Sequence, residues 1–159
     1  MFEQLKNWVR SSPSASVVEA QKHENELIQI FIEQAKILGD NPDFPPKAKP
    51  HLENIVFNIK QIDMIKLPIE TQVKLERILS KDIPIAVETY FSLPKAHAVS
   101  VILENGKTAK QTLIDQFGQY ANLLSNTWQD AINQQSKILV QNEKINNKVS
   151  APKKDFFDL

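Results

Sequence analysis

The sequence predicts an all-α protein, a bundle of four or five helices that includes a long C-terminal helix. Apolar residues recur every three or four positions over most of the chain, which is the spacing of one helix face. The segment A-V-S-V-I-L at residues 98–103 favours a β-strand, but a single strand without a partner is not stable. The length of 159 residues corresponds to one domain, large enough to bury a hydrophobic core.

Residues 1–12 are predicted to form a short amphipathic helix of their own. Phe2, Leu5 and Trp8 share one helical face, and a serine-rich linker follows them. Such a helix could dock on its own domain, on a protein partner or on a membrane surface. We therefore treat it as separate from the main bundle, which we assign to residues 13–149.

The first helix of the bundle is predicted over residues 17–38, with Leu27, Phe31 and Leu38 on its apolar stripe and Gly39 as a left-handed C-terminal residue. Residues 39–50 contain four prolines, so we expect an extended or polyproline connector there. The next apolar stripe predicts a helix over residues 51–66, which stops before Pro68.

The stretch from Asp82 to Pro94 carries the densest apolar and aromatic side chains of the chain. One helix is expected over residues 69–79, followed by a second that Asp82 caps. The alternative is a single helix over residues 69–92 that Pro84 kinks. In either case we expect this stretch to lie in the hydrophobic core. Tyr90, Phe91, Val87 and Ile83 would pack there against Phe117, Leu124 and Trp128 of the long helix.

Residues 95–107 are expected to be an irregular, partly buried connection. Thr108 and Gln111 then form a T-x-x-Q capping box that opens a helix over residues 109–147. Phe117, Trp128 and Leu139 lie eleven residues apart, which favours a straight or slightly right-handed helix over a strict heptad coiled coil. Residues 150–159 are predicted to be a flexible tail.

Composition excludes several classes of function. The 19 basic and 19 acidic residues cancel, so no basic field is available to bind nucleic acid. The absence of cysteine excludes disulfides, zinc-thiolate sites and a cysteine nucleophile. No apolar run approaches the ~20 residues that span a bilayer, and the first residues do not resemble a signal peptide. We therefore expect a cytoplasmic location.

The letters E-N-G-K-T at residues 104–108 resemble the end of a phosphate-binding loop. That motif requires an earlier glycine, and Val101 stands in its place. A turn at Gly106 and a helix cap at Thr108 account for the same residues without a bound phosphate. We therefore predict no nucleotide cofactor.

The histidines do not predict a reactive site either. Glu19, His23 and Glu26 share one side of a helix, but a metal-binding bundle needs a second such set on another helix. His51 and His97 have no carboxylate partner nearby in the sequence, and we interpret both as surface residues. The sequence thus predicts no catalytic, cofactor-binding or metal-binding residue.

The two ends of the chain carry the candidate partner-docking residues. Phe156, Phe157 and Leu159 stand among acidic residues in a tail that has no folding reason to keep them, which is typical of short docking motifs. The alternative is that the tail folds back on its own bundle. Phe2, Leu5 and Trp8 are the corresponding candidates at the N-terminus.

The phrase I-P-I-A-V-E-T-Y-F-S-L-P at residues 83–94, then E-N-G-K-T-A and a long terminal helix, resembles a poorly characterised bacterial all-helical module. In that module an L-P-x5-Y-x2-L-P phrase precedes a G-[KR]-T helix start. The same region is faintly similar to the bromochloroindolyl-phosphate hydrolysis and toxic-anion-resistance families. This chain departs from the pattern at Ile83, where leucine is usual, and in a longer insert before Gly106. The resemblance implies an all-helical bacterial domain and no catalytic residues.

The sequence therefore favours a non-enzymatic interaction or adaptor protein, whose partner is an unidentified protein, with a homo-oligomer among the options. The second hypothesis is a peripheral membrane-surface protein linked to envelope stress or toxic-anion resistance. It would bind through Phe2, Leu5 and Trp8. A hydrolase is the third.

Overall fold

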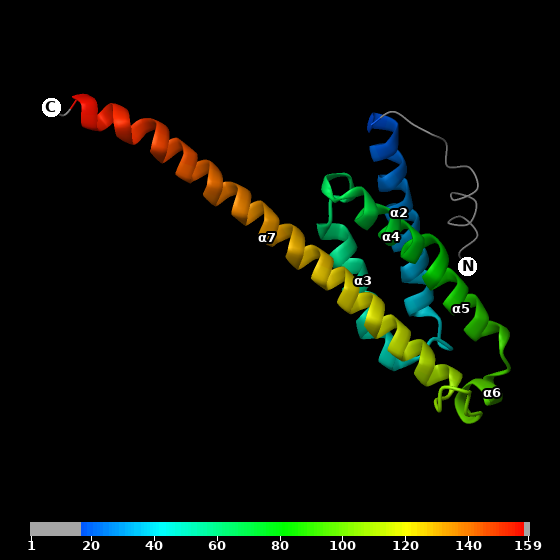
Figure 1. Ribbon diagram of the computed structural model, residues 1–159. Coiled ribbons are helices and arrows are strands. Elements are labelled where there is room, and N and C mark those ends of the chain that lie inside the picture. Colours follow the sequence, from blue (N-terminus) through cyan, green and yellow to red (C-terminus); the bar gives the residue numbers. More distant parts are fainter. Residues whose placement is uncertain (1–16, 158–159) are drawn as a thin grey trace. The chain divides into compact units, whose positions relative to one another are not determined.

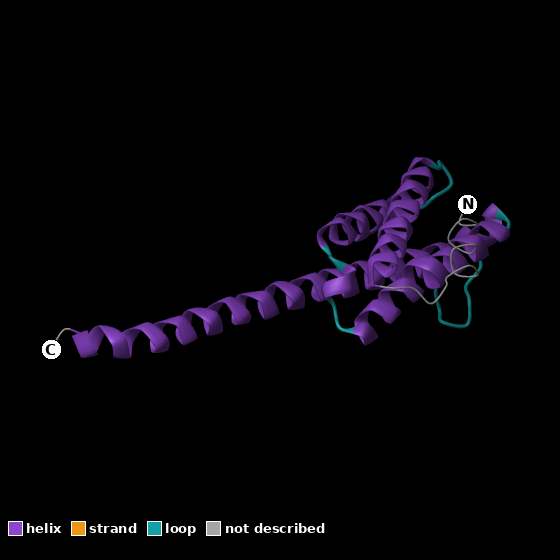
Figure 2. Cartoon of the chain, turned by 90° about the horizontal axis from the view of Figure 1, so that it is seen from above, coloured by secondary structure: helices purple, strands orange, loops and turns teal. Residues whose placement is uncertain are grey.

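The computed structural model describes the backbone of residues 17–157 and the side chains of residues 22–64 and 66–147. Over this part of the chain the predicted all-α fold with a long C-terminal helix is confirmed (Figures 1 and 2). The predicted N-terminal helix, residues 1–12, lies outside the described residues. The elements are α2 (Val17–Asp40), η1 (Pro46–Ala48), α3 (Lys49–Gln61), η2 (Met64–Lys66), α4 (Ile69–Arg77), η3 (Ile78–Asp82), α5 (Ile83–Ser92), α6 (Lys95–Ser100) and α7 (Ala109–Phe157).

The chain divides into two compact units, Met1–Ser125 and Asn126–Leu159, and α7 contributes to both. In the first unit α2 packs against α3, η2 and η3. Its core consists of apolar side chains from every one of its longer helices. The largest fully buried side chains are Phe31, Phe44, Phe117, Leu27, Leu38, Ile55, Leu75, Leu79, Ile83 and Leu124.

Helix α2 buries the predicted stripe but ends differently from the prediction. Leu27, Phe31 and Leu38 are each 0% exposed. Gly39 stays helical, because Gly106 is the only residue in the described backbone with a positive φ. The helix ends at Asp40, and the backbone N–H of Asn41 then donates to the Leu38 carbonyl at 3.1 Å.

The proline-rich segment, residues 39–50, is more ordered than the predicted extended connector. Pro46–Ala48 form a 3-10 turn, and α3 begins at Lys49 with Pro50 in its first turn, where the missing N–H costs little. Phe44, with 1% of its surface exposed, enters the core and meets the ring of Phe117 edge-on at 5.5 Å. Pro45 and Ala48 are buried as well, so these three residues hold the segment on the bundle.

Helix α3 is shorter than predicted. It ends at Gln61, because Ile62 adopts an extended backbone with ψ of 125°, and a 3-10 turn over Met64–Lys66 leads to Pro68. Ile62 and Met64 are buried, so this non-helical link still contributes to the core.

Of the two predictions for residues 69–92, the single kinked helix is closer to the structure. α4 continues through a π-helical turn, η3, directly into α5. Asp82 does not cap a helix, because its backbone is helical and its side chain makes no capping bond. Pro84 explains the wide turn, since its ring would clash with the Ser80 carbonyl in a regular α-helix. The Ser80 hydroxyl donates to the Glu76 carbonyl at 2.5 Å within this turn.

The prediction that Asp82 to Pro94 lies in the hydrophobic core is correct for the first half of this stretch only. Ile83 and Val87 are buried, at 0% and 1% exposure, whereas Tyr90 and Phe91 are only partly buried. The rings of Tyr90 and Phe91 contact each other edge-on with centroids 5.4 Å apart. These two aromatic residues therefore belong to the surface of the first unit and not to its core.

Residues 95–107 are not the irregular connection that the sequence predicted. Residues Lys95–Ser100 form the short helix α6, and Ile102 then makes an isolated antiparallel bridge with Thr108. Gly106, at φ 78°, closes the turn between them.

The predicted start of the long helix is confirmed. The backbone N–H of Gln111 donates to the Thr108 hydroxyl at 3.1 Å, so Thr108 caps α7. The side chain of Gln111 donates to Asp115 at 2.9 Å and not back to the cap. The helix continues past the predicted end at Asn147 to Phe157.

Candidate interaction surfaces

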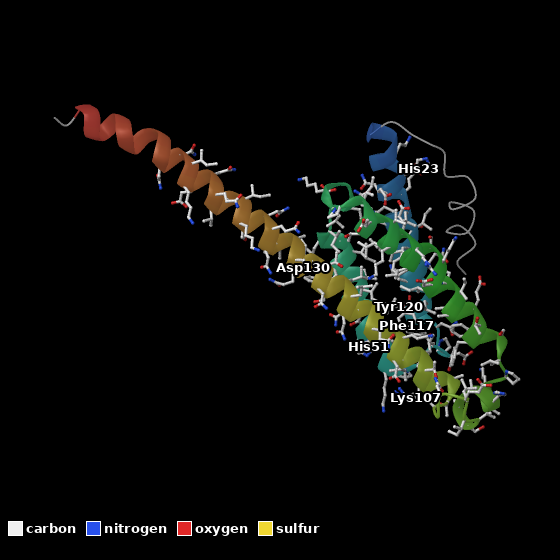
Figure 3. The ribbon with its side chains drawn as sticks, viewed as in Figure 1. His23, His51, Lys107, Phe117, Tyr120 and Asp130 are labelled. Atoms are coloured by element: carbon white, nitrogen blue, oxygen red, sulfur yellow. The ribbon has the colours of Figure 1, made fainter. Side chains whose placement is uncertain are left out.

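A cavity of about 380 Å³ lies between α5 and the start of α7 in the first unit. We call it the tyrosine cleft, because Tyr90 from α5 and Tyr120 from α7 both line it. Figure 3 labels Tyr120 beside the buried Phe117, whose ring it contacts edge-on at 6.5 Å. The other lining residues are Asp82, Ile85, Ala86, Thr89, Leu93, Leu103, Ala109, Thr112, Leu113 and Gln116.

The polar groups of the tyrosine cleft include its two phenols and the Thr112 hydroxyl. Burial raises the pKa of both tyrosines, with smaller contributions from Asp43 for Tyr90 and from Asp82 for Tyr120. Both phenols are therefore neutral near pH 7. The Thr112 hydroxyl donates to the Thr108 carbonyl at 2.8 Å and accepts from Asn105 at 3.1 Å, so its proton is already in a hydrogen bond.

A second hollow of about 290 Å³ adjoins the cleft and shares Tyr90 and Leu93 with it. Lys95 lies on its rim, and its ammonium group pairs with the Asp43 carboxylate at 2.8 Å. The two hollows together place the partly buried Tyr90 ring between two small apolar depressions. The sequence predicted Tyr90 in the core, and the contribution of Tyr120 could not be foreseen because that residue comes from a distant helix.

A carboxyl pair lies elsewhere in the first unit, between α2 and α4. Glu24 is buried, at 8% exposure, and shares a side-chain hydrogen bond with the partly buried Glu76. Burial, which is the largest cause, together with the hydrogen bond and the negative charge of Glu76 raises the pKa of Glu24 to about 8. The carboxyl of Glu24 is therefore largely protonated at neutral pH. The sequence offered no signal for this pair, since the two residues are far apart along the chain.

The second unit carries an uncharged face on α7. Its large apolar members towards the C-terminus are exposed, with Ile138 at 56%, Leu139 at 71% and Ile145 at 57%, whereas Trp128 and Ile132 are partly buried. None of the side chains in residues 126–147 is buried. With about 100° per residue, one side of the helix collects uncharged residues only. This uncharged face consists of Trp128, Ala131, Ile132, Gln135, Ile138, Leu139, Asn142 and Ile145.

The predicted docking residues cannot be placed on these surfaces. Phe2, Leu5, Trp8 and Leu159 lie outside the described residues. The backbone of Phe156 and Phe157 belongs to α7, but their side chains are not described. Docking through either end of the chain therefore stays a prediction.

The loop at residues 104–108 has the structural role that the sequence predicted. The Lys107 ammonium pairs with the Asp115 carboxylate, and this bond lowers the pKa of Asp115. His51 from α3 lies against α7, because a Cβ on Gly118 would meet its ring at 3.4 Å. The charge of His51 also contributes to the lowered pKa of Asp115, a carboxylate neighbour that spacing along the sequence did not reveal.

The described residues include no cluster of three histidine, aspartate or glutamate side chains that could hold a metal ion. The side chain of Glu19 is not among them. No helix within the described part is both long enough and apolar enough to cross a membrane.

Comparisons with protein-family models, with curated proteins and with solved structures found no match to this chain. A functional conclusion therefore rests on the described surfaces themselves.

Proposed function

We propose that this chain is a non-enzymatic interaction protein that binds another polypeptide through the uncharged face of α7. The exposure of Ile138, Leu139 and Ile145 on one side of a helix carries the proposal. Exposed apolar residues scattered singly are ordinary, but a row of them on one helix face is typical of a protein interface.

Helix energetics support the same conclusion. Isolated helices are marginally stable in water, and most helices in proteins are stabilised by packing of an apolar face. Within residues 126–147 no side chain is fully buried, and every side chain of residues 133–147 is exposed. Burying a leucine or isoleucine fully contributes roughly 1.5–3 kcal/mol, so covering three of them stabilises this helix substantially. A partner that covers the face supplies that contribution.

The tyrosine cleft fits a binding role as well. Its two neutral phenols and apolar lining can hold a ligand by hydrogen bonds and apolar contact. A hydrolytic role would need an activated nucleophile, and the Thr112 hydroxyl is already held between Thr108 and Asn105. These contacts favour interaction over catalysis.

A photo-crosslinking amino acid at position 139 tests the proposal. We expect irradiation of native host cells to join residue 139 covalently to a polypeptide, because Leu139, at 71%, is more exposed than Ile138 and Ile145 of the same face. The same probe at position 137 is the matched control, since Lys137 lies on the opposite side of α7. Mass spectrometry identifies the joined chains. Equal crosslinking at both positions, or none at 139, would contradict the proposal.

The membrane-surface hypothesis stays a separate prediction, because Phe2, Leu5 and Trp8 are not described. If it is correct, the full chain should sediment with anionic liposomes, and a chain that lacks residues 1–12 should stay in the supernatant. Equal pelleting of the two chains would exclude this role for the N-terminal helix. The link to envelope stress and toxic-anion resistance, and the cytoplasmic location, also remain predictions.

A further inference from the structure

The uncharged face continues the apolar side of α7 that the first unit buries. Within residues 109–125, Ile114, Phe117, Ala121 and Leu124 alternate by three and four residues and are buried. The same alternation continues through Trp128, Ala131, Gln135, Ile138, Asn142 and Ile145. Positions that pack inside a core in one unit thus carry exposed isoleucines in the other. In heptad notation, Trp128, Gln135 and Asn142 take position a, and Ile138 and Ile145 take position d.

The charged residues of this segment lie away from the uncharged face. Every charged side chain in residues 126–147 lies outside the uncharged face; these are Asp130, Lys137, Glu143 and Lys144. Gln134 and Gln141 flank the uncharged face on one side, and Ser136 and Glu143 flank it on the other. A partner chosen by opposite charge would find only Glu143 at the edge of this face. When two copies of the uncharged face meet, no like charges within it repel each other, so the face can pair with a second copy of itself.

We propose that the uncharged face pairs with the same face of a second copy of this chain, as a parallel two-stranded coiled coil. This inference rests on the proposed function and names its partner. Asn142 supports the parallel orientation. An asparagine at position a faces its own copy in a parallel, in-register pair, where the two amides hydrogen-bond to each other. In an antiparallel pair it would face a d position, which is Ala131 or an isoleucine, and its amide would have no amide of the second copy to bond with.

The eleven-residue spacing of Phe117, Trp128 and Leu139 is compatible with this pairing. A straight helix drifts by only about 20° per heptad from a seven-residue repeat. With about 100° per residue, the uncharged face covers an arc of roughly 140° around the axis of α7. An arc of this width stays turned towards the partner over three heptads. The slight left-handed twist of the pair removes the remaining drift.

The mass of the full chain in solution tests the pairing. Light scattering after gel filtration should give twice the chain mass of 18.1 kDa. The double variant Ile138→Asp with Ile145→Asp should weaken dimerisation at least about tenfold, because it places like charges at both d positions. The matched control, Asn133→Asp with Val140→Asp, adds two charges on the opposite side and should remain dimeric. Circular dichroism verifies that both variants fold. A monomeric parent chain, or a dimer that both variants leave intact, would overturn the proposal.

A single cysteine introduced at position 135 tests the orientation, since the chain has no cysteine of its own and Gln135 also takes position a, so that Asn142 stays in place. The Gln135→Cys variant should oxidise to a disulfide-linked dimer, and the Lys137→Cys variant should not. A dimer of the Gln135→Cys variant in which the introduced thiol stays reduced would overturn the parallel arrangement. If the parent chain is monomeric while residue 139 crosslinks to a different polypeptide in cells, self-pairing fails and the interaction function stands.

Discussion

Replacing Phe117 with alanine should lower the free energy of unfolding of the first unit by about 3–5 kcal/mol. Phe117 is fully buried, and its ring meets Phe44 at 5.5 Å and Tyr120 at 6.5 Å, edge-on in both cases. The substitution therefore opens a cavity between α7 and the proline-rich segment. It also removes two aromatic contacts that contribute about 0.5–1.5 kcal/mol each beyond the area they bury. Urea denaturation followed by circular dichroism measures the loss.

Tyr90→Ala is the matched control for this prediction. Both changes remove an aromatic ring, but Tyr90 is only partly buried, so its loss should cost about 1–2 kcal/mol. Equal losses for the two variants would show that Tyr90 belongs to the core, as the sequence alone predicted. A loss below about 1 kcal/mol for Phe117→Ala would contradict the close packing of this ring.

The helices with the clearest apolar periodicity could be predicted from sequence because local spacing determines which side of a helix is buried. Leu27, Phe31 and Leu38 fall on one stripe and are buried together. The start of α7 was equally predictable, since Thr108 caps it by a bond that involves only residues three apart. These features depend on short-range physical chemistry, which the sequence displays directly.

Features that depend on tertiary contacts were missed. Four prolines predicted an extended or polyproline connector at residues 39–50, yet the fold buries Phe44 because α7 places Phe117 opposite it. The tyrosine cleft needs Tyr90 and Tyr120 from two helices, and no local pattern relates them. The π-helical turn at Ile78–Asp82 could not be predicted from Pro84 alone. The packing on both sides of the turn also has to keep the helix continuous despite the clash that this proline causes. In each case the deciding partner lies outside the local pattern.

Replacing Glu24 with glutamine should remove a pH dependence of stability that the parent chain shows between about pH 4.5 and 8. Its ordinary pKa of 4.5 applies in the unfolded chain, and burial beside Glu76 raises the pKa to about 8 in the folded protein. Between these two values the folded state holds a proton that the unfolded state has lost. The stability of the parent chain must therefore fall as pH rises through this window.

The expected size of the effect follows from the two pKa values. Each pKa unit corresponds to about 1.4 kcal/mol, so a rise from 4.5 to about 8 sets an upper limit of about 5 kcal/mol, and the parent chain should lose about 4 kcal/mol from this group between pH 4.5 and 8.5. Glutamine is neutral throughout and can donate a hydrogen bond to Glu76. Glu24→Gln should thus match the parent chain near pH 4.5 and be about 4 kcal/mol more stable near pH 8.5. Urea denaturation at a series of pH values measures the difference.

Two further substitutions separate the causes of the raised pKa. Glu26→Gln removes an exposed carboxylate from the same helix and should leave the pH dependence of the parent chain unchanged. Glu76→Gln removes the negative neighbour but not the burial, which is the larger cause, so the pKa of Glu24 should fall only part of the way towards 4.5. The loss of stability would then occur over a narrower range of pH. If Glu76→Gln abolished the pH dependence completely, repulsion between the two carboxylates, and not burial, would be the dominant force on Glu24.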